Sequence, residues 1–175
     1  MNKNDKTQVI RLALRIVTTL ACLIWAAFIL SNSLKTSEQS STQSAAVVET
    51  VQKVAKAIAP QSKIANATGE AYDMLHVFVR NLAHFGQFAV LGALLCWCYF
   101  AYTLQVKHFY LPILGVVCIP IFDEWIQGFV AGRSWELIDL ALDICGGFIG
   151  LFCAMLSVYI GCWVYKRKKR KAGTE

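Results

Sequence analysis

The stretch that decides the fold is residues 137–171, LIDLALDICGGFIGLFCAMLSVYIGCWVYKRKKRK. Its first part, 137–165, is largely apolar and exceeds the roughly 20 residues that a helix needs to cross a bilayer. Six basic residues, 166–171, follow without a break. A basic run that abuts a hydrophobic span is typical of a membrane helix whose end meets anionic lipid headgroups. The stretch therefore predicts a membrane-spanning helix that ends in the cytoplasm.

The remainder of the chain has the same membrane-like character. Hydrophobic residues make up 57% of the 175 residues and charged residues only 16%, against about 25% charged residues in an average soluble domain. Further apolar blocks of spanning length occupy about residues 12–31, 82–104 and 109–130. This composition excludes a disordered chain. We predict an all-α integral membrane four-helix bundle that forms one domain over residues 1–175.

The basic residues are distributed unevenly between the two sides of this bundle. If the N-terminus is cytoplasmic, that side carries eleven of the seventeen Lys and Arg residues and two of the eleven acids, a net charge of +9 against −3 on the other side. The positive-inside rule then places both termini of this multi-pass cell-membrane protein in the cytoplasm. The overall charge of +6 does not indicate a nucleic-acid partner, because its densest run directly follows a hydrophobic span.

The longest stretch outside the apolar blocks is an extracytoplasmic segment, about residues 32–80. Its first part, 33–44, is rich in Ser, Thr and Gln, and we expect it to be flexible. Apolar residues then recur at helical spacing until a proline ends the pattern. The apolar positions are Val47, Val51, Val54 and Ile58, and the proline is Pro60. This pattern predicts a short amphipathic helix that lies on the outer interface or against the bundle.

Polar side chains concentrate at one depth of the predicted bundle. Each block has them near the end that we place outside, and the inner halves have almost none. They are Arg80, Asn81, His84 and Gln87 at the second block, Asp123, Glu124 and Gln127 in the third, Asp139 and Asp143 in the fourth, and Ser31, Asn32 and Ser33 at the end of the first. Residues three or four apart share a helix face, so we expect these side chains to converge.

Asp123 and Glu124 lie deepest among them. With a rise of 1.5 Å per helical residue, they are roughly 9 Å below the outer surface of a 30 Å hydrocarbon core. A bare carboxylate costs several kcal/mol at such a depth. We therefore expect both to face the bundle interior, with His84, Arg80 or Arg133 as partners. Because Pro120 precedes the pair, the helix is expected to kink there or to restart with Asp123 as its N-cap.

Each of these residues also has a purely structural interpretation. Buried acids can pair with Arg simply to hold a bundle together, and His84 can be a hydrogen bonder in a helix contact. Asp139 can be a first-turn acid that the helix dipole favours, with Ser134 as the N-cap. Small residues spaced three or four apart permit close helix packing in membranes. We expect that role for Gly146, Gly147 and Gly150.

Several strings of this sequence resemble those of the VanZ-like family. The strings are Phe28-x2-Ser31-x-Ser33, Arg80-x3-His84-Phe85-x2-Phe88, Asp123-Glu124-Trp125-Ile126-Gln127, Gly132-Arg133-Ser134 and Asp139-x3-Asp143-x2-Gly146-x3-Gly150. Together they touch all four predicted spans. The position of Asp143 is more often Asn in that family, so the resemblance does not imply a catalytic carboxylate there. The segment 34–79 is not a family signature.

The resemblance implies a bacterial cytoplasmic-membrane protein of the cell envelope. The family's namesake lowers susceptibility to teicoplanin, a lipoglycopeptide, without making the altered peptidoglycan precursor. An antibiotic-resistance function is thus an expectation from the resemblance, and the sequence itself carries no motif for it.

Two functions fit the polar residues. In the first, the protein binds or modifies a lipid-linked envelope precursor, a membrane lipid or a lipophilic antibiotic at the outer leaflet. The ligand-binding candidates are Arg80, Gln127, Arg133 and Asp139, and the two arginines would meet a charged headgroup. As a guanidinium, Arg133 can bind either Asp123 or an anionic headgroup bidentately. We favour the ligand role for Arg133, because Arg80 can serve the structural pairing instead.

In the second function, the protein is a small intramembrane enzyme, a hydrolase or transferase. The catalytic candidates are His84, Asp123 and Glu124, which offer acid–base or hard-metal ligand chemistry. We expect no cofactor and no resident metal, since the sequence has no His-Glu-x-x-His spacing and no serine or cysteine nucleophile motif. A transporter is a weaker third alternative, because four spans would require a homo-oligomer.

Overall fold

The computed structural model describes residues 2–103, 108–171 and 173. It contains five helices, α1 (Lys3–Ser33), α2 (Ser37–Ile58), α3 (Glu70–Tyr102), α4 (Tyr110–Gln127) and α5 (Leu137–Lys171). Four of them, all except α2, are long and apolar enough to cross a membrane. The residues that the structure describes include no strand. The protein is therefore an all-α, multi-pass membrane protein, as its apolar blocks predict.

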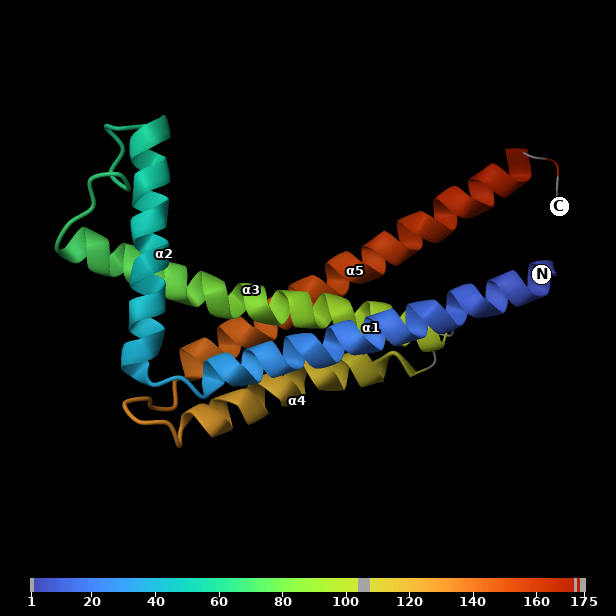
Figure 1. Ribbon diagram of the computed structural model, residues 1–175, viewed down its shortest axis with the longest axis horizontal. Coiled ribbons are helices and arrows are strands. Elements are labelled where there is room, and N and C mark those ends of the chain that lie inside the picture. Colours follow the sequence, from blue (N-terminus) through green and yellow to red (C-terminus); the bar gives the residue numbers. More distant parts are fainter. Residues whose placement is uncertain (1, 104–107, 172, 174–175) are drawn as a thin grey trace.

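The four spanning helices run side by side, and α2 crosses one end of them at a steep angle (Figure 1). Both chain termini lie at the opposite end. We call the end with α2 the polar end, because the polar residues of all four spans gather there. At this end α1 and α4 finish, and α5 begins. Helix α3 also enters from this side, so α3 and α5 run parallel.

The contact between α3 and α5 depends on glycine. A Cβ atom on Gly146 would lie 2.2 Å from the carbonyl oxygen of Phe85, and one on Gly150 would lie 1.7 Å from that of Ala89. Real Cβ atoms do not approach other atoms so closely, so only glycine permits this backbone separation. The predicted packing role of these glycines is confirmed. The close contact also fixes the relative register of the two helices.

Two small groups of buried apolar side chains fill the space between the spans. One consists of Cys96, Val116, Leu151 and Ala154, and the other of Ile29, Phe88 and Leu91. Most other large hydrophobic side chains of the four spans are exposed on the outside of the bundle. In a membrane these side chains contact lipid tails, so their exposure carries no hydrophobic penalty.

The prediction that 33–44 is flexible is wrong. Helix α2 begins at Ser37, and a capping box stabilises its start. The Thr36 hydroxyl accepts a hydrogen bond from the Gln39 backbone N–H (3.3 Å), and the Gln39 side chain accepts one from the Thr36 N–H (3.1 Å). This reciprocal pair satisfies two N–H groups that a helix start leaves free. The predicted amphipathic helix is confirmed and ends at Ile58.

Two further expectations about helix boundaries need correction. Helix α3 begins at Glu70 and not near residue 82, because its first turns carry acidic residues that do not count toward an apolar span. Helix α4 continues through Pro120 to Gln127, so Asp123 is not an N-cap. The carbonyl that Pro120 frees is one turn earlier, and the helix tolerates its loss.

Candidate functional site

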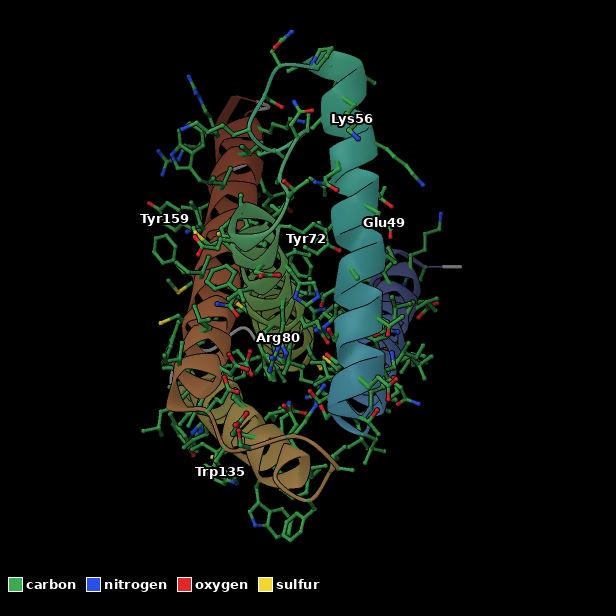
Figure 2. The ribbon with its side chains drawn as sticks, turned by 90° about the vertical axis from the view of Figure 1, so that its left-hand side faces the viewer. Glu49, Lys56, Tyr72, Arg80, Trp135 and Tyr159 are labelled. Carbon is green, nitrogen blue, oxygen red and sulfur yellow. The ribbon has the colours of Figure 1, made fainter. Side chains whose placement is uncertain are left out.

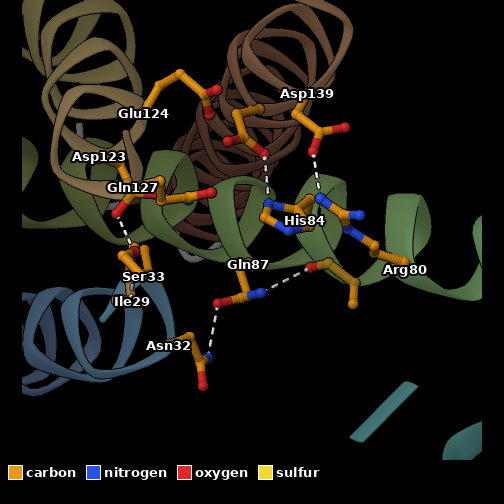
Figure 3. A network of polar contacts seen from close by, with 12 residues as sticks. Ile29, Asn32, Ser33, Arg80, His84, Gln87, Asp123, Glu124, Gln127 and Asp139 are labelled. Atoms are coloured by element: carbon orange, nitrogen blue, oxygen red, sulfur yellow. Dashed lines mark hydrogen bonds and ion pairs between the residues drawn. The ribbon is translucent and has the colours of Figure 1, made fainter. Parts of the chain in front are cut away.

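The polar end carries all of the buried polar side chains that occur among the described residues. They are Ser33, Asp123, Glu124, Gln127, Asp139 and Asp143, each no more than 5% exposed. Together with Arg80, His84 and Arg133 they form what we call the polar cluster. Figure 3 shows most of its members, including Ser33, Arg80, His84, Asp123 and Asp139. All four spans contribute to it, as the sequence predicts, and Asp123 and Glu124 face the bundle interior.

Within the cluster, two basic residues of α3 face two acidic residues of α5. Arg80 donates a hydrogen bond to Asp139 at 3.0 Å, and His84 Nδ1 lies 3.6 Å from Asp143 Oδ1. Arg80 and His84 are four residues apart on α3, and Asp139 and Asp143 are four residues apart on α5, so both pairs have the same separation along the chain. Because the glycine contacts fix the register, the two basic side chains face the two acids together.

Asp143 is the most buried of these four residues. It is fully buried, and neither of its oxygens accepts a hydrogen bond from the described residues. His84 is the group that lies against it, with 12% of its side chain exposed. The charge of this carboxylate favours the ring orientation that brings one nitrogen toward it, and the other nitrogen is then available to a ligand.

Asp123 and Glu124 have partners other than the expected ones. The Asp123 carboxylate accepts hydrogen bonds from the Ser33 hydroxyl and, at 2.7 Å, from the Gln127 amide. Glu124 accepts one from the backbone N–H of Glu136 at 2.7 Å. Among the described residues neither acid forms an ion pair with Arg80, His84 or Arg133. The expectation of cationic partners is therefore wrong, because neutral donors stabilise both carboxylates.

The Glu124 contact explains how α5 begins. Helix α5 starts at Leu137, and the Leu140 N–H donates to the Glu136 carbonyl, so Glu136 occupies the cap position that we expected for Ser134. A carboxylate beside the first N–H groups of a helix is favoured by the helix dipole. Glu124 thus joins the end of α4 to the start of α5.

Arg133 lies in the loop between α4 and α5, after Gly132, whose φ of +76° favours glycine. It donates a hydrogen bond to the Gln127 side-chain oxygen at 2.5 Å. Burial, followed by the nearby positive charge of Arg80, lowers the pKa of Arg133 from its ordinary value. Arg80 and Arg133 line the same cavity, so an anion bound there would reduce the repulsion between their charges.

Beside the polar cluster lies a cavity of about 700 Å³. Its apolar walls come from the end of α1, from α2 and from the first half of α3. The apolar residues are Phe28, Ile29, Ala46, Val47, Val51, Val79, Leu82, Ala83 and Phe88. Its polar lining includes Lys35, Arg80, His84, Asp123, Gln127 and Arg133. Figure 2, which looks onto the polar end, shows Arg80 between α3 and α2 and Trp135 at the margin of this end.

The cavity separates the predicted site residues into two groups. Arg80, His84, Asp123, Gln127 and Arg133 line it, whereas Glu124 and Asp139 lie outside its lining. The sequence placed Asp143 among the converging polar residues without a catalytic role, and it did not indicate Ser33 or Lys35 as ligand-binding residues. The equal four-residue spacings of Arg80–His84 and Asp139–Asp143 on two parallel helices were the signal for the Asp143 contact. No group of three His, Cys, Asp or Glu side chains that could hold a metal occurs among the described residues.

The four spans and their shared polar cluster define a multi-pass membrane protein with a polar pocket at one end of the bundle. The chain belongs to the VanZ/LLP1 family, whose sequence model matches residues 18–160. The match covers most of all four spans, and includes every member of the polar cluster. No curated protein and no solved structure matches the chain.

Proposed function

We propose that this protein binds a lipid-linked or lipophilic ligand at the outer leaflet of a bacterial cell membrane, with both termini in the cytoplasm. The observation that carries the proposal is the composition of the cavity. One part of its lining is apolar and comes from α1, α2 and α3, and the other part is polar and largely cationic. An amphiphile has the same division, because its tail is apolar and its headgroup is charged.

The cavity is also large enough for part of such a ligand. Its volume of about 700 Å³ lies within the roughly 300–1,000 Å³ that is typical of small-molecule sites. The headgroup would contact Arg80 and Arg133, with Gln127 beside them, while Asp139 acts by holding Arg80. The tail would run along Phe28 and Leu82, two lining residues that are 44% and 55% exposed.

Mass spectrometry of the purified full-length protein tests this proposal. We expect amphiphiles to co-purify in gentle detergent, and Arg133→Gln to reduce their amount by about tenfold, the effect of losing one charged hydrogen bond. Lys53→Gln is the matched control, because Lys53 is an exposed cation of α2 outside the cavity. Equal amphiphile content in wild type and Arg133→Gln would contradict the proposal.

Family membership extends the proposal to antibiotic susceptibility. If the ligand is lipoglycopeptide-like or is a wall precursor, expression of the protein in a susceptible bacterium should raise the teicoplanin concentration that stops growth. Arg133→Gln should lose this effect at unchanged membrane abundance, while Lys53→Gln should keep it. If both variants raised the teicoplanin concentration equally, the resistance would not depend on the cavity.

The His84–Asp143 contact favours an enzyme as a second candidate function. A cavity-lining imidazole that a buried carboxylate orients is suited to proton transfer, whereas Glu124 lies outside the cavity. Lipid extract incubated with the protein should then show altered lipid masses, and His84→Gln should abolish the change. Gln can still donate to Asp143, so binding should survive. Unaltered masses with wild-type protein would leave binding as the function.

A further inference from the structure

Three cationic side chains from three different elements line the same cavity. Lys35 follows the end of α1, Arg80 belongs to α3, and Arg133 lies in the loop before α5. Asp123 is the one acid of the lining among the described residues, and its oxygens accept hydrogen bonds from Ser33 and Gln127. Asp139, just outside the lining, pairs with Arg80, so the three cations exceed these two acids by one positive charge.

The hydrogen bonds of these cations leave donors for a ligand. Arg80 uses one terminal nitrogen for Asp139, and its buried Nε has no partner among the described residues. Arg133 uses Nη1 for the neutral Gln127, and Lys35 contacts the neutral Asn32 and Gln43 at 2.7 and 3.1 Å. A buried donor without a partner costs free energy, so these groups favour an anionic ligand that brings several acceptors.

Charge and shape distinguish between the possible anions. A carboxylate carries one charge and two coplanar oxygens, which a single guanidinium satisfies. A phosphate monoester carries about −1.5 to −2 charges at pH 7 and has three strong acceptor oxygens that point in different directions. Cationic donors that approach from three elements match the phosphate, because its three acceptor oxygens point in different directions.

We propose that the headgroup bound in this cavity is a phosphate, held by Lys35, Arg80 and Arg133, and that the natural ligand is a phosphate-bearing lipid. This inference rests on the proposed function and specifies its ligand class. Its chemistry is shared by a lipid phosphate and by free phosphate. The apolar walls favour the lipid.

Binding of a chain-matched series of probes tests the inference. Dodecyl phosphate, dodecanoate and dodecanol have the same alkyl chain and differ in the headgroup, and inorganic phosphate has no chain. Their affinities for the full-length protein in lipid nanodiscs should be measured by competition against a fluorescent alkyl phosphate. We expect dodecyl phosphate to bind at least about tenfold more tightly than each of the other three, the factor that one charged hydrogen bond contributes.

Variants then locate the phosphate. Arg133→Gln and Lys35→Gln should each weaken the binding of dodecyl phosphate by about tenfold and leave the affinity for dodecanol unchanged. Lys53→Gln should change neither probe. Arg80→Gln is less suitable, because it also leaves Asp139 buried without its partner. Folding of each variant is checked by its elution as a single species in size-exclusion chromatography.

The outcomes separate this inference from the proposed function. Equal affinities for dodecyl phosphate and dodecanoate, or for all three alkyl probes, would overturn the phosphate class and leave amphiphile binding intact. If inorganic phosphate bound as tightly as dodecyl phosphate, the phosphate class would stand and the lipid part of the proposed function would fail. Absence of binding by every probe would overturn both. Unchanged phosphate affinity in Arg133→Gln and Lys35→Gln would overturn the assigned residues.

Discussion

Loss of His84 should destabilise the fold more than loss of Asp143. Asp143 is fully buried, whereas His84 borders the cavity. Removing His84 leaves a buried carboxylate alone, which costs about 3–5 kcal/mol when a buried pair is broken. Removing Asp143 leaves only an imidazole N–H that cavity water can reach. We therefore predict that His84→Leu lowers the free energy of unfolding more than Asp143→Leu does.

Unfolding of the two variants by SDS in mixed micelles measures this difference. Asp143→Asn is the matched control, because it removes the charge but keeps the size of the side chain and a polar oxygen that faces His84. It should be more stable than Asp143→Leu. A His84→Leu variant as stable as the wild type would show that Asp143 does not need the imidazole.

Arg80 and Asp139 should be coupled in a double-mutant cycle. Their atoms lie 3.0 Å apart, with side-chain exposures of 33% and 6%. Arg80→Ala leaves Asp139 buried without its cation, so it should lower membrane abundance strongly. The double variant Arg80→Ala/Asp139→Ala should recover part of that loss, with a coupling energy of about 1–3 kcal/mol. Strictly additive effects in SDS unfolding would contradict the pairing.

At the scale of helices, the crossing of α3 and α5 determines whether the polar cluster assembles. Gly150→Ala would place a Cβ atom 1.7 Å from the Ala89 carbonyl oxygen, so the two helices must separate. We predict that this variant loses about 1–3 kcal/mol, the usual cost of overpacking. The melting temperature in detergent should fall accordingly.

The same helix provides the matched control for this variant. A Cβ atom on Gly161 would meet nothing within 4 Å, and Ala is a better helix former than Gly. Gly161→Ala should therefore leave the melting temperature unchanged or raise it slightly. Equal destabilisation by both substitutions would mean that the contact at Gly150 is not the cause.

The sequence predicted the membrane spans well, but it predicted the ends of the helices and the extent of α2 poorly. The spans and the shared depth of their polar residues follow from hydropathy and spacing, because lipid forces every backbone group into helix hydrogen bonds. The extent of α2 did not follow, since Ser and Thr have weak helix propensity and a local capping box compensates for it. The start of α3 was missed because hydropathy marks a span and not the turns that project beyond it.

The partners within the cluster were harder to predict than its members. Asp123 and Glu124 were correctly expected inside, because a bare carboxylate in lipid is costly. Their actual donors, the Ser33 hydroxyl and the Glu136 backbone N–H, depend on where α1 ends and α5 begins to within one residue. Hydropathy does not resolve helix ends so finely, and backbone donors leave no mark in a sequence.

At the scale of the whole molecule, the polar groups and the chain termini lie at opposite ends of the bundle's long axis. The polar cluster, the cavity and α2 occupy one end, and the two termini occupy the other (Figure 1). An even number of spans requires both termini on one side of the membrane, and the structure satisfies this. The positive-inside rule predicts that the side with the termini is the cytoplasmic one.

Most of the basic residues that decide this orientation lie at the end with the termini. The run 166–170 ends α5, and Arg15 of α1 donates hydrogen bonds to the last carbonyls of α3, Ala101 and Tyr102 (3.1 and 3.5 Å). Lys107 and Glu175, which also enter the count, lie outside the described residues. Position 172, which would otherwise suit a label at the C-terminal end, lies outside them as well. The remaining charges still favour a cytoplasmic location for this end.

Cysteine labelling in intact cells tests the orientation. In a variant whose seven native cysteines are replaced by alanine, Ala45→Cys in α2 should react with a membrane-impermeant maleimide. Gly173→Cys should react only after the cells are permeabilised. The reverse pattern would place the cavity in the cytoplasm, where an envelope ligand of the outer leaflet cannot reach it, and the proposed function would fail together with the orientation.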